Sequence, residues 1–222
     1  MSINIETYNA IIEAIKHKAT LVAVSKTKPV EDILELYNRG QRDFGENYVQ
    51  ELVNKYDQLP KDIRWHFIGH LQSNKVKYIA PFVHLIHGVD SLSLLKEINK
   101  QALKSDRTIN CLLQMHIAKE ETKFGFDEQE LNELPDLKEF KNSFICGFMG
   151  MASFSDDINL VKSEFSSLKK IFDKFAQQPT ANFKPQTLSM GMSGDYKTAI
   201  EEGSNMVRIG SLLFGERNYQ NK

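Results

Sequence analysis

The amino-acid sequence predicts an α/β protein that folds as a single (β/α)8 TIM barrel with one extra N-terminal helix. Eight short apolar segments alternate with helical segments along the 222 residues, which is the order that a minimal barrel requires. Most of these segments are continuously apolar, as in parallel strands covered on both faces. No linker rich in Pro, Gly or Ser divides the chain, so we expect one domain over residues 1–222. An open doubly wound sheet is the alternative architecture.

The helical segments show apolar residues at spacings of three and four. The first precedes the first strand and is marked by Ile5, Tyr8, Ile11, Ile12 and Ile15. The remaining helices are expected over residues 30–39, 48–57, 92–103, 156–177 and 195–202. Ser91 is an expected N-cap, and Gly40 and Gly203 are expected stops. The strands are expected over residues 21–25, 43–47, 65–69, 83–87, 109–117, 144–149, 187–190 and 206–209. The charged segment 119–123 is expected to be a solvated loop.

The composition argues against several classes of protein. Hydrophobic residues make up 41% and charged residues 26%, as in ordinary globular proteins, and the net charge of −1 gives no field that would attract nucleic acid. The two cysteines, Cys111 and Cys146, form no disulfide framework, which favours a reducing compartment. The N-terminus does not resemble a secretory signal, and no apolar run has the length of a membrane span. We therefore expect a cytoplasmic protein that binds neither nucleic acid nor membrane.

Lys26 is the most informative single position, because it follows the first expected strand directly. A lysine at the mouth of a barrel can reach into a pocket on its four-carbon stem. If that pocket lowers its pKa, the free amine can form a Schiff base with an aldehyde. The alternative is a solvated loop lysine, one of 28 Lys and Arg residues in the chain.

The loops after the seventh and eighth expected strands indicate a phosphate site. Ser193 is expected to cap the helix that starts near Asp195, whose first N–H groups would face an anion. Gly191 and Gly210 would let backbone amides approach that anion closely. Phosphate binding by these two loops recurs among barrels. Ordinary turn chemistry is the alternative explanation for the same residues.

Arg208 lies in the eighth expected strand, where a buried cation needs a partner. Either it forms an ion pair with a carboxylate of a neighbouring strand, or it is a fixed cation that faces a ligand. The six histidines predict no metal site. His66 and His70 straddle the end of a strand, and no carboxylate or cysteine completes a recognisable ligand set with them.

Five segments carry recognisable motifs in a fixed order. They are Ala-Val-Ser-Lys-Thr-Lys-Pro at 23–29, Phe-Gly-Glu-Asn-Tyr-Val-Gln-Glu at 44–51, Trp-His-Phe-Ile-Gly-His-Leu-Gln-Ser-Asn-Lys at 65–75, Ser-Met-Gly-Met-Ser at 189–193 and Met-Val-Arg-Ile-Gly at 206–210. Together they resemble the pyridoxal phosphate homeostasis protein family, from Leu21 to Tyr219. The fold of that family resembles the N-terminal barrel of alanine racemase.

The resemblance implies pyridoxal 5′-phosphate (PLP) as the cofactor, carried by Lys26 as an internal aldimine. It assigns the phosphate to Ser193, Gly210 and Ser211. Arg208, by likeness to a racemase motif, would face the pyridine nitrogen. A cation there disfavours protonation of the ring and weakens the cofactor as an electron sink. The full expected set of cofactor-binding residues is Lys26, Asn47, Met149, Ser189, Gly191, Met192, Ser193, Arg208, Gly210 and Ser211.

The expected function is that of a PLP carrier or buffer without catalytic turnover. The expected partners are PLP and PLP-dependent apo-enzymes, and we expect a monomer. The first alternative is a PLP-dependent amino-acid racemase. In alanine racemase the second acid/base comes from a partner subunit with an additional β-domain, for which a chain ending at Lys222 leaves no room. The second alternative is a barrel enzyme that acts on phosphate esters without an aldehyde cofactor.

Overall fold

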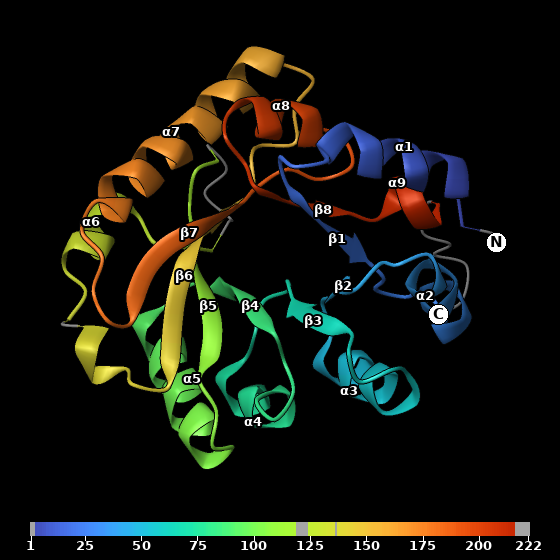
Figure 1. The fold of residues 1–222 in the computed structure, drawn as a ribbon. Coiled ribbons are helices and arrows are strands. Elements are labelled where there is room, and N and C mark those ends of the chain that lie inside the picture. The colour runs from blue at the N-terminus through green and yellow to red at the C-terminus, as the bar shows by residue number, and fades with distance from the viewer. Residues whose placement is uncertain (1–2, 119–123, 136, 216–222) are drawn as a thin grey trace.

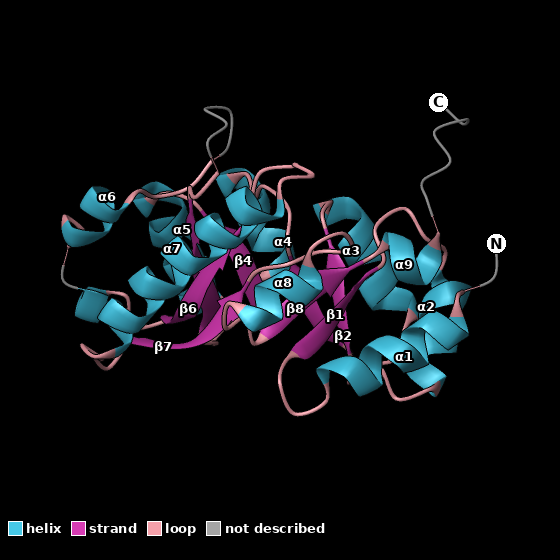
Figure 2. Cartoon of the chain, turned by 90° about the horizontal axis from the view of Figure 1, so that it is seen from above, coloured by secondary structure: helices cyan, strands magenta, loops and turns pink. Residues whose placement is uncertain are grey.

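Eight parallel strands close into a barrel in the order in which they occur along the chain. A computed structural model describes residues 3–118, 124–135 and 137–215. The strands lie in the middle of the molecule and the helices surround them (Figure 1, Figure 2). The predicted (β/α)8 barrel is therefore confirmed, and the open sheet was the wrong alternative. The charged segment 119–123, expected to be a solvated loop, lies outside the described residues.

All eight expected strands are present, and most bounds differ from the prediction by one or two residues. The strands are β1 Thr20–Val24, β2 Asp43–Glu46, β3 Arg64–Phe67, β4 Leu85–Val89, β5 Ile109–Met115, β6 Ser143–Gly150, β7 Phe183–Ser189 and β8 Met206–Ile209. β7 begins four residues earlier than expected. The prediction missed this first half because its polar residues Lys184 and Gln186 alternate with buried ones and interrupt the apolar run. Every residue of β2 and of β4 is buried, including the charged residues Asp43 and Glu46 of β2.

The helices α2 to α8 lie between successive strands, while α1 precedes β1 and α9 follows β8. They are α1 Ile5–Ile15, α2 Val30–Asn38, α3 Val49–Gln58, α4 Val76–Ile79, α5 Leu92–Lys104, α6 Glu128–Asn132, α7 Ile158–Ala176, α8 Tyr196–Glu201 and α9 Ser211–Phe214. The hydroxyl of Ser91 accepts a hydrogen bond from the Leu94 N–H and so caps α5 as predicted. The short helices α4, α6 and α9 were not predicted, since four or five residues are too few to show a helical period.

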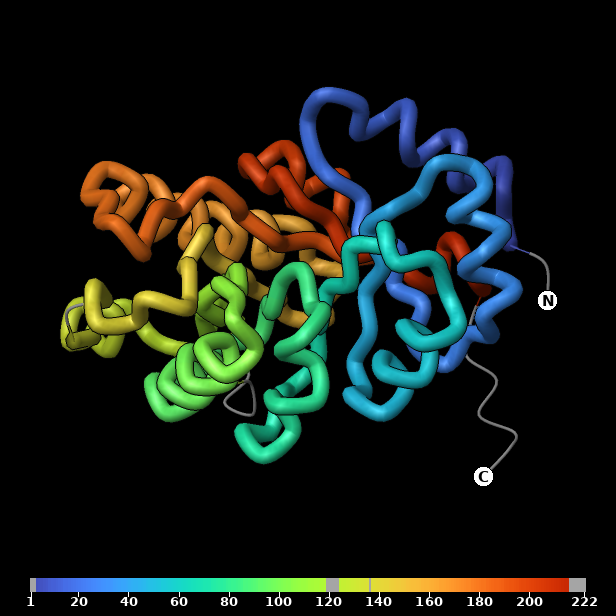
Figure 3. The backbone as a smooth tube through the Cα atoms, turned by 60° about the horizontal axis from the view of Figure 1, so that its bottom comes forward, coloured from blue at the N-terminus to red at the C-terminus, as the bar shows by residue number. Residues whose placement is uncertain are grey.

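The extra N-terminal helix α1 lies against the C-terminal helix α9. The Asn4 N–H donates a hydrogen bond of 2.9 Å to the Leu213 carbonyl, and Tyr8, Ile11 and Ile15 are buried beneath the helix. Both views of the backbone show the first and last described segments next to each other (Figure 1, Figure 3). None of the described helices is long and apolar enough to cross a membrane.

The seam between β7 and β8 closes the barrel with little regular ladder. In the described part of the chain a single pair, Ser189 with Met206, is in register there. Side chains supply further bonds across the seam: the Leu188 N–H donates to Asn205 Oδ1 at 2.8 Å, and Ser204 Oγ donates to the Met190 carbonyl at 2.7 Å. Backbone bonds cross it as well, from the N–H groups of Met190, Asn205 and Arg208 to the carbonyls of Met206, Leu188 and Gly191. Backbone and side-chain bonds therefore together join the segments that carry Ser189 and Arg208.

Candidate functional site

A cavity of about 470 Å³ lies where the carboxyl ends of β1, β2 and β8 meet the loop after β7. Seven of the ten residues that the sequence singles out line it: Lys26, Asn47, Met192, Ser193, Arg208, Gly210 and Ser211. The remaining lining residues include Phe154, whose side chain is fully exposed, and Lys28 and Asp195. Most of the residues that the sequence singles out therefore lie around one cavity.

Three predicted residues do not line the cavity, and each has another place in the structure. Met149 is buried in a small apolar cluster with Leu85 and Leu112. Ser189 is buried behind Arg208 and bonds its guanidinium. Gly191 has a φ of +95°, and a Cβ there would lie 2.5 Å from the Cβ of Ala199, so the turn requires glycine. Their predicted contact with a ligand stays a prediction.

The backbone around Lys26 is held by the neighbouring strand and helix. Thr27, the next residue, has a φ of +64°, which is rare for a β-branched residue. Its N–H donates a hydrogen bond of 2.6 Å to Glu51 Oε1 on α3. The Ser25 carbonyl, one residue before Lys26, accepts a bond of 2.8 Å from Lys55 Nζ. The lysine therefore leaves β1 from a fixed and conformationally unusual turn, as is common at functional sites.

Beneath this turn lies a buried group of charges that the sequence did not predict. Lys55 Nζ donates to Glu46 Oε1 at 2.8 Å and to Glu51 Oε1 at 2.7 Å, and Ser25 Oγ donates to Glu46 Oε1 at 2.6 Å. Burial raises the pKa of Glu46 to about 7, although the Lys55 ammonium opposes this shift. Both glutamates belong to the motif at 44–51. Their role is to support the Lys26 turn, since neither lines the cavity.

The prediction that Ser193 caps the helix near Asp195 is wrong. The N-cap of α8 is Asp195 itself, and no side chain caps its first N–H groups. Ser193 lies two residues earlier, and its hydroxyl accepts a hydrogen bond of 3.3 Å from the Gly210 N–H. Asp195 Oδ1 instead accepts from the Met192 N–H at 2.5 Å. The Ser193 hydroxyl thereby joins the loop after β7 to the end of β8, next to the cavity.

Arg208 is nine-tenths or more buried and is held by oxygen atoms of two strands. Its Nη1 donates to the Ser189 carbonyl at 2.8 Å and to Ser189 Oγ at 2.6 Å, and its Nη2 donates to the Gly150 carbonyl at 3.0 Å. Burial lowers the pKa of Arg208 to about 10, with Asp195 opposing the shift. The side chain has no ion pair with a carboxylate among the described residues, so the alternative of an interstrand ion pair was wrong.

The histidines lie closer to a carboxylate than the sequence indicated. Donor atoms of Asp43, His66 and His84 fall within 4.8 Å of one another. The Asp43 carboxylate, however, already accepts bonds from Arg64 and from His66 Nε2, the latter at 3.0 Å. The Asp43 and His66 atoms are thus satisfied by protein partners, and we assign no metal ligand among these residues.

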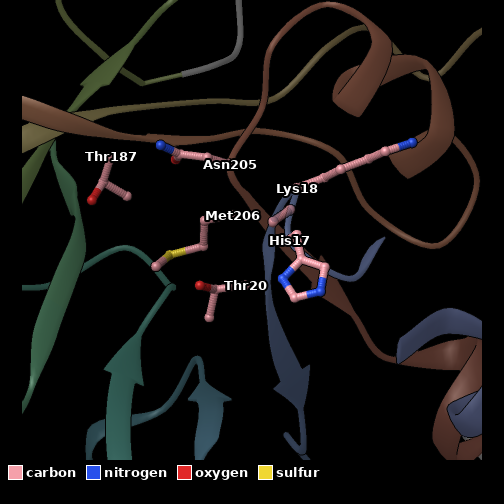
Figure 4. A pocket seen from close by; sticks show the side chains of 7 residues that line it. His17, Lys18, Thr20, Thr187, Asn205 and Met206 are labelled. Atoms are coloured by element: carbon pink, nitrogen blue, oxygen red, sulfur yellow. The ribbon is translucent and has the colours of Figure 1, made fainter. Parts of the chain in front are cut away.

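A second cavity, of about 380 Å³, lies at the amino ends of β1 and β8. Figure 4 shows its polar lining, with His17 and Lys18 from the turn before β1 and Asn205 from the turn before β8. It contains none of the residues that the sequence predicted for a site. The cavity beside Lys26 is therefore the one that the predicted residues define.

Comparisons with known proteins identify the family. The family model described as alanine racemase, N-terminal domain, matches residues 3–218. The pyridoxal phosphate homeostasis protein of Aquifex aeolicus is 42% identical over 203 residues, which cover 90% of this chain and 88% of that protein. This chain belongs to the pyridoxal phosphate homeostasis protein family. Members from Synechocystis and from Homo sapiens are 38% and 37% identical and cover 95% and 91% of this chain, and 97% and 78% of their own lengths.

Solved structures of the family share the whole barrel. PipY of Synechococcus elongatus, solved without PLP, matches with a TM-score of 0.89 at 33% identity, over 95% of this chain and 99% of PipY. The form of PipY with PLP bound matches with a TM-score of 0.86 at 34% identity, over the same shares. Alanine racemase of Bartonella henselae matches with a TM-score of 0.73 at 17% identity, over 97% of this chain and 60% of the racemase, which shows a shared fold.

Proposed function

We propose that this protein holds PLP in the cavity beside Lys26 and acts as a carrier or buffer of the cofactor, without catalytic turnover. The observation that carries the proposal is the placement of the Lys26 amine in one cavity with the Ser193 and Ser211 hydroxyls and the Arg208 guanidinium. A lysine amine can bond covalently to an aldehyde. Serine hydroxyls and glycine amides can bind a phosphate. PLP combines these two groups on one electron-withdrawing aromatic ring.

The residues present fit such a ligand. Asn47 Oδ1 is buried and has no hydrogen-bond partner among the described residues, although Asn47 lines the cavity. Buried polar atoms are nearly always bonded, so this acceptor is available to a donor on a ligand. At Gly210 a Cβ would lie 3.2 Å from the Val24 carbonyl oxygen. Glycine therefore allows the backbone after β8 to pack closely against β1, next to Ser211.

The other titratable residues that line the cavity support a carrier over a racemase. Lys28 Nζ donates to the Phe214 carbonyl at 2.6 Å, and Asp195 Oδ1 accepts from the Met192 N–H. Both are therefore engaged in holding loops, whereas two-base racemisation requires a second mobile acid/base opposite Lys26. With PLP bound, the Arg208 cation would face the ring nitrogen. There it would disfavour ring protonation and weaken the electron-withdrawing effect on which racemisation depends.

We further propose a cytoplasmic monomer that passes PLP to PLP-dependent apo-enzymes. Both cysteines of the chain, Cys111 and Cys146, are free thiols in the structure, as is usual in a reducing compartment. Burial raises the pKa of the Cys111 thiol well above its usual range, so this thiol is unreactive. Transfer is tested by comparing the rate at which an apo-enzyme gains PLP from the loaded protein with the rate of release into solution. A rate no faster than release contradicts direct transfer.

Covalent attachment is tested by borohydride reduction of the PLP-loaded protein followed by peptide mass spectrometry. The expected result is one pyridoxyl adduct, on Lys26. Lys26→Ala abolishes it, while Lys28→Ala, a lysine in the wall of the same cavity, retains it. A wild-type protein that gains no adduct overturns the proposal. Conversion of L-alanine to D-alanine by the wild type, lost in Lys26→Ala, would replace the carrier by the racemase.

A further inference from the structure

A continuous row of polar side chains crosses the interior of the barrel and ends at Arg208. It starts at Asp43 on β2 and passes through His66 on β3, His87 on β4 and Ser189 on β7. His66 Nε2 lies 3.0 Å from Asp43 Oδ1, His66 Nδ1 lies 2.9 Å from His87 Nε2, and His87 Nδ1 lies 3.1 Å from Ser189 Oγ. Ser189 Oγ in turn accepts from Arg208 Nη1 at 2.6 Å. All five side chains are buried.

The route of this row is unusual. β4 and β7 are not neighbours in the barrel, so the contact between His87 and Ser189 spans its interior. Barrel interiors are commonly filled by apolar layers. Two buried imidazoles at this position cost desolvation, and they are tolerated only because each nitrogen has a partner. Stability alone would be served better by Leu or Val.

The chemistry of the two ends fixes the direction of the two outer hydrogen bonds of the row. Arg208 only donates, so Ser189 Oγ accepts from it, which leaves the hydroxyl hydrogen available to His87 Nδ1. At the other end, burial raises the pKa of Asp43. Bonds from Arg64 and His66 outweigh this effect and lower the pKa to about 2. The ionised Asp43 carboxylate only accepts, so His66 Nε2 carries a hydrogen.

The middle of the row has an arrangement that continues the same direction. Burial lowers the pKa of His87 well below its usual range, so this imidazole is neutral and carries a single N–H. With Ser189 donating to His87 Nδ1, that hydrogen lies on Nε2 and is donated to His66 Nδ1. In this arrangement every bond from Arg208 to Asp43 is donated in the same direction. Successive bonds of this kind polarise and strengthen one another.

We propose that His87 and His66 are positioning residues, which link Arg208 to the Asp43 carboxylate and thereby fix the guanidinium at the cofactor cavity. Arg208 has no direct carboxylate partner among the described residues. The row connects its guanidinium, through hydrogen bonds, to the negative charge of the Asp43 carboxylate. The inference rests on the proposed function for the identity of the ligand that Arg208 faces. The row itself is a property of the protein without ligand.

The first experiment needs no cofactor. Histidine side-chain ¹⁵N spectra of the PLP-free protein, assigned with His66→Gln and His87→Leu, report which ring nitrogen carries the hydrogen. The expected result is the Nε2–H tautomer for both His66 and His87. An Nδ1–H tautomer at His87 would reverse the direction of the bonds and overturn the proposal, whether or not the protein binds PLP.

The second experiment uses the loaded protein, with PLP labelled with ¹⁵N in the ring. His87→Leu and Asp43→Asn are each expected to shift the ring ¹⁵N resonance and to weaken PLP binding about tenfold, the scale of one lost hydrogen bond to a charged group. His84→Gln is the matched control. Its ring centre lies 5.5 Å from that of His66, outside the row, and burial lowers its pKa to about 4, so it is neutral in the assay.

The outcomes separate the two proposals. If the wild type binds no PLP, the proposed function fails, and the tautomers still decide whether the row exists. If the wild type binds PLP and both variants keep its resonance and affinity, the positioning role is wrong. Because His87→Leu alters a fully buried site, Asp43→Asn provides the second test: it preserves the side-chain shape and acts from the far end of the row.

Discussion

The buried carboxyl of Glu46 makes the stability of this protein depend on pH in an uncommon direction. The pKa of Glu46 is about 7 in the folded protein, against 4.5 for an ordinary glutamate. The folded state therefore favours the protonated form. Below about pH 4.5 both states are protonated and the folded protein carries no penalty. As the pH rises from 4.5 to 7 the unfolded chain loses its proton first, and stability falls.

The magnitude follows from the size of the shift. A difference of about 2.5 pKa units corresponds to roughly 3 kcal/mol, of which about 2.5 kcal/mol is lost between pH 5 and pH 8. Glu46→Gln removes this titration while keeping an oxygen that can accept from Ser25 Oγ and Lys55 Nζ. We expect the free energy of unfolding of the variant, relative to the wild type, to increase by about 2.5 kcal/mol from pH 5 to pH 8.

Urea unfolding at the two pH values measures this difference. Glu51→Gln is the comparison variant, because Glu51 bonds the same Lys55 ammonium at 2.7 Å but is partly exposed. Its charge contributes to the raised pKa of Glu46, so this variant should keep the pH dependence in weakened form. If the wild type and Glu46→Gln differ by the same free energy at pH 5 and at pH 8, the reasoning about the Glu46 pKa is refuted.

Two further predictions concern the backbone around the cavity. Gly191→Ala forces a side chain onto a φ of +95° and a Cβ to within 2.5 Å of the Ala199 Cβ, so we expect a loss of about 2 kcal/mol and a melting temperature lower by about 4–8 °C. An unchanged melting temperature would contradict that turn geometry. Thr27→Gly relieves a φ of +64° but adds freedom to the unfolded chain, so we expect a net gain of about 1 kcal/mol. Thermal unfolding measures both, and a clear loss of stability in Thr27→Gly would show that the turn beside Lys26 is not strained.

The strands and the place of Lys26 could be predicted because they depend on local signals. Continuous apolar runs mark parallel strands, and the carboxyl ends of barrel strands share one face. The support beneath Lys26 could not be predicted in this way. Lys55 and Glu46 are nine residues apart and belong to different elements, and charged residues are normally read as exposed.

The remaining differences have the same origin. Ser193 resembles a helix cap in sequence, but its bond goes to Gly210, which lies 17 residues later, directly after β8. His87 and Ser189 are 102 residues apart and meet across the interior, so no local pattern indicates their contact. Contacts of this kind depend on how the barrel closes. The extent of the domain, the contacts of each site residue with a ligand and the oligomeric state stay predictions.

The seam between β7 and β8 is expected to open less often when a ligand occupies the cavity. Residues of the proposed PLP site lie on both sides of it, with Ser193 after β7 and Arg208 and Gly210 at the end of β8. A ligand held by both sides favours the closed seam by mass action, in proportion to the logarithm of its concentration over its dissociation constant. Amide hydrogen exchange in β8 is therefore expected to slow as the cavity fills. The fraction of protein with PLP in the cavity could then be measured from the amide exchange rates of this one strand pair, even where the overall fold is unchanged.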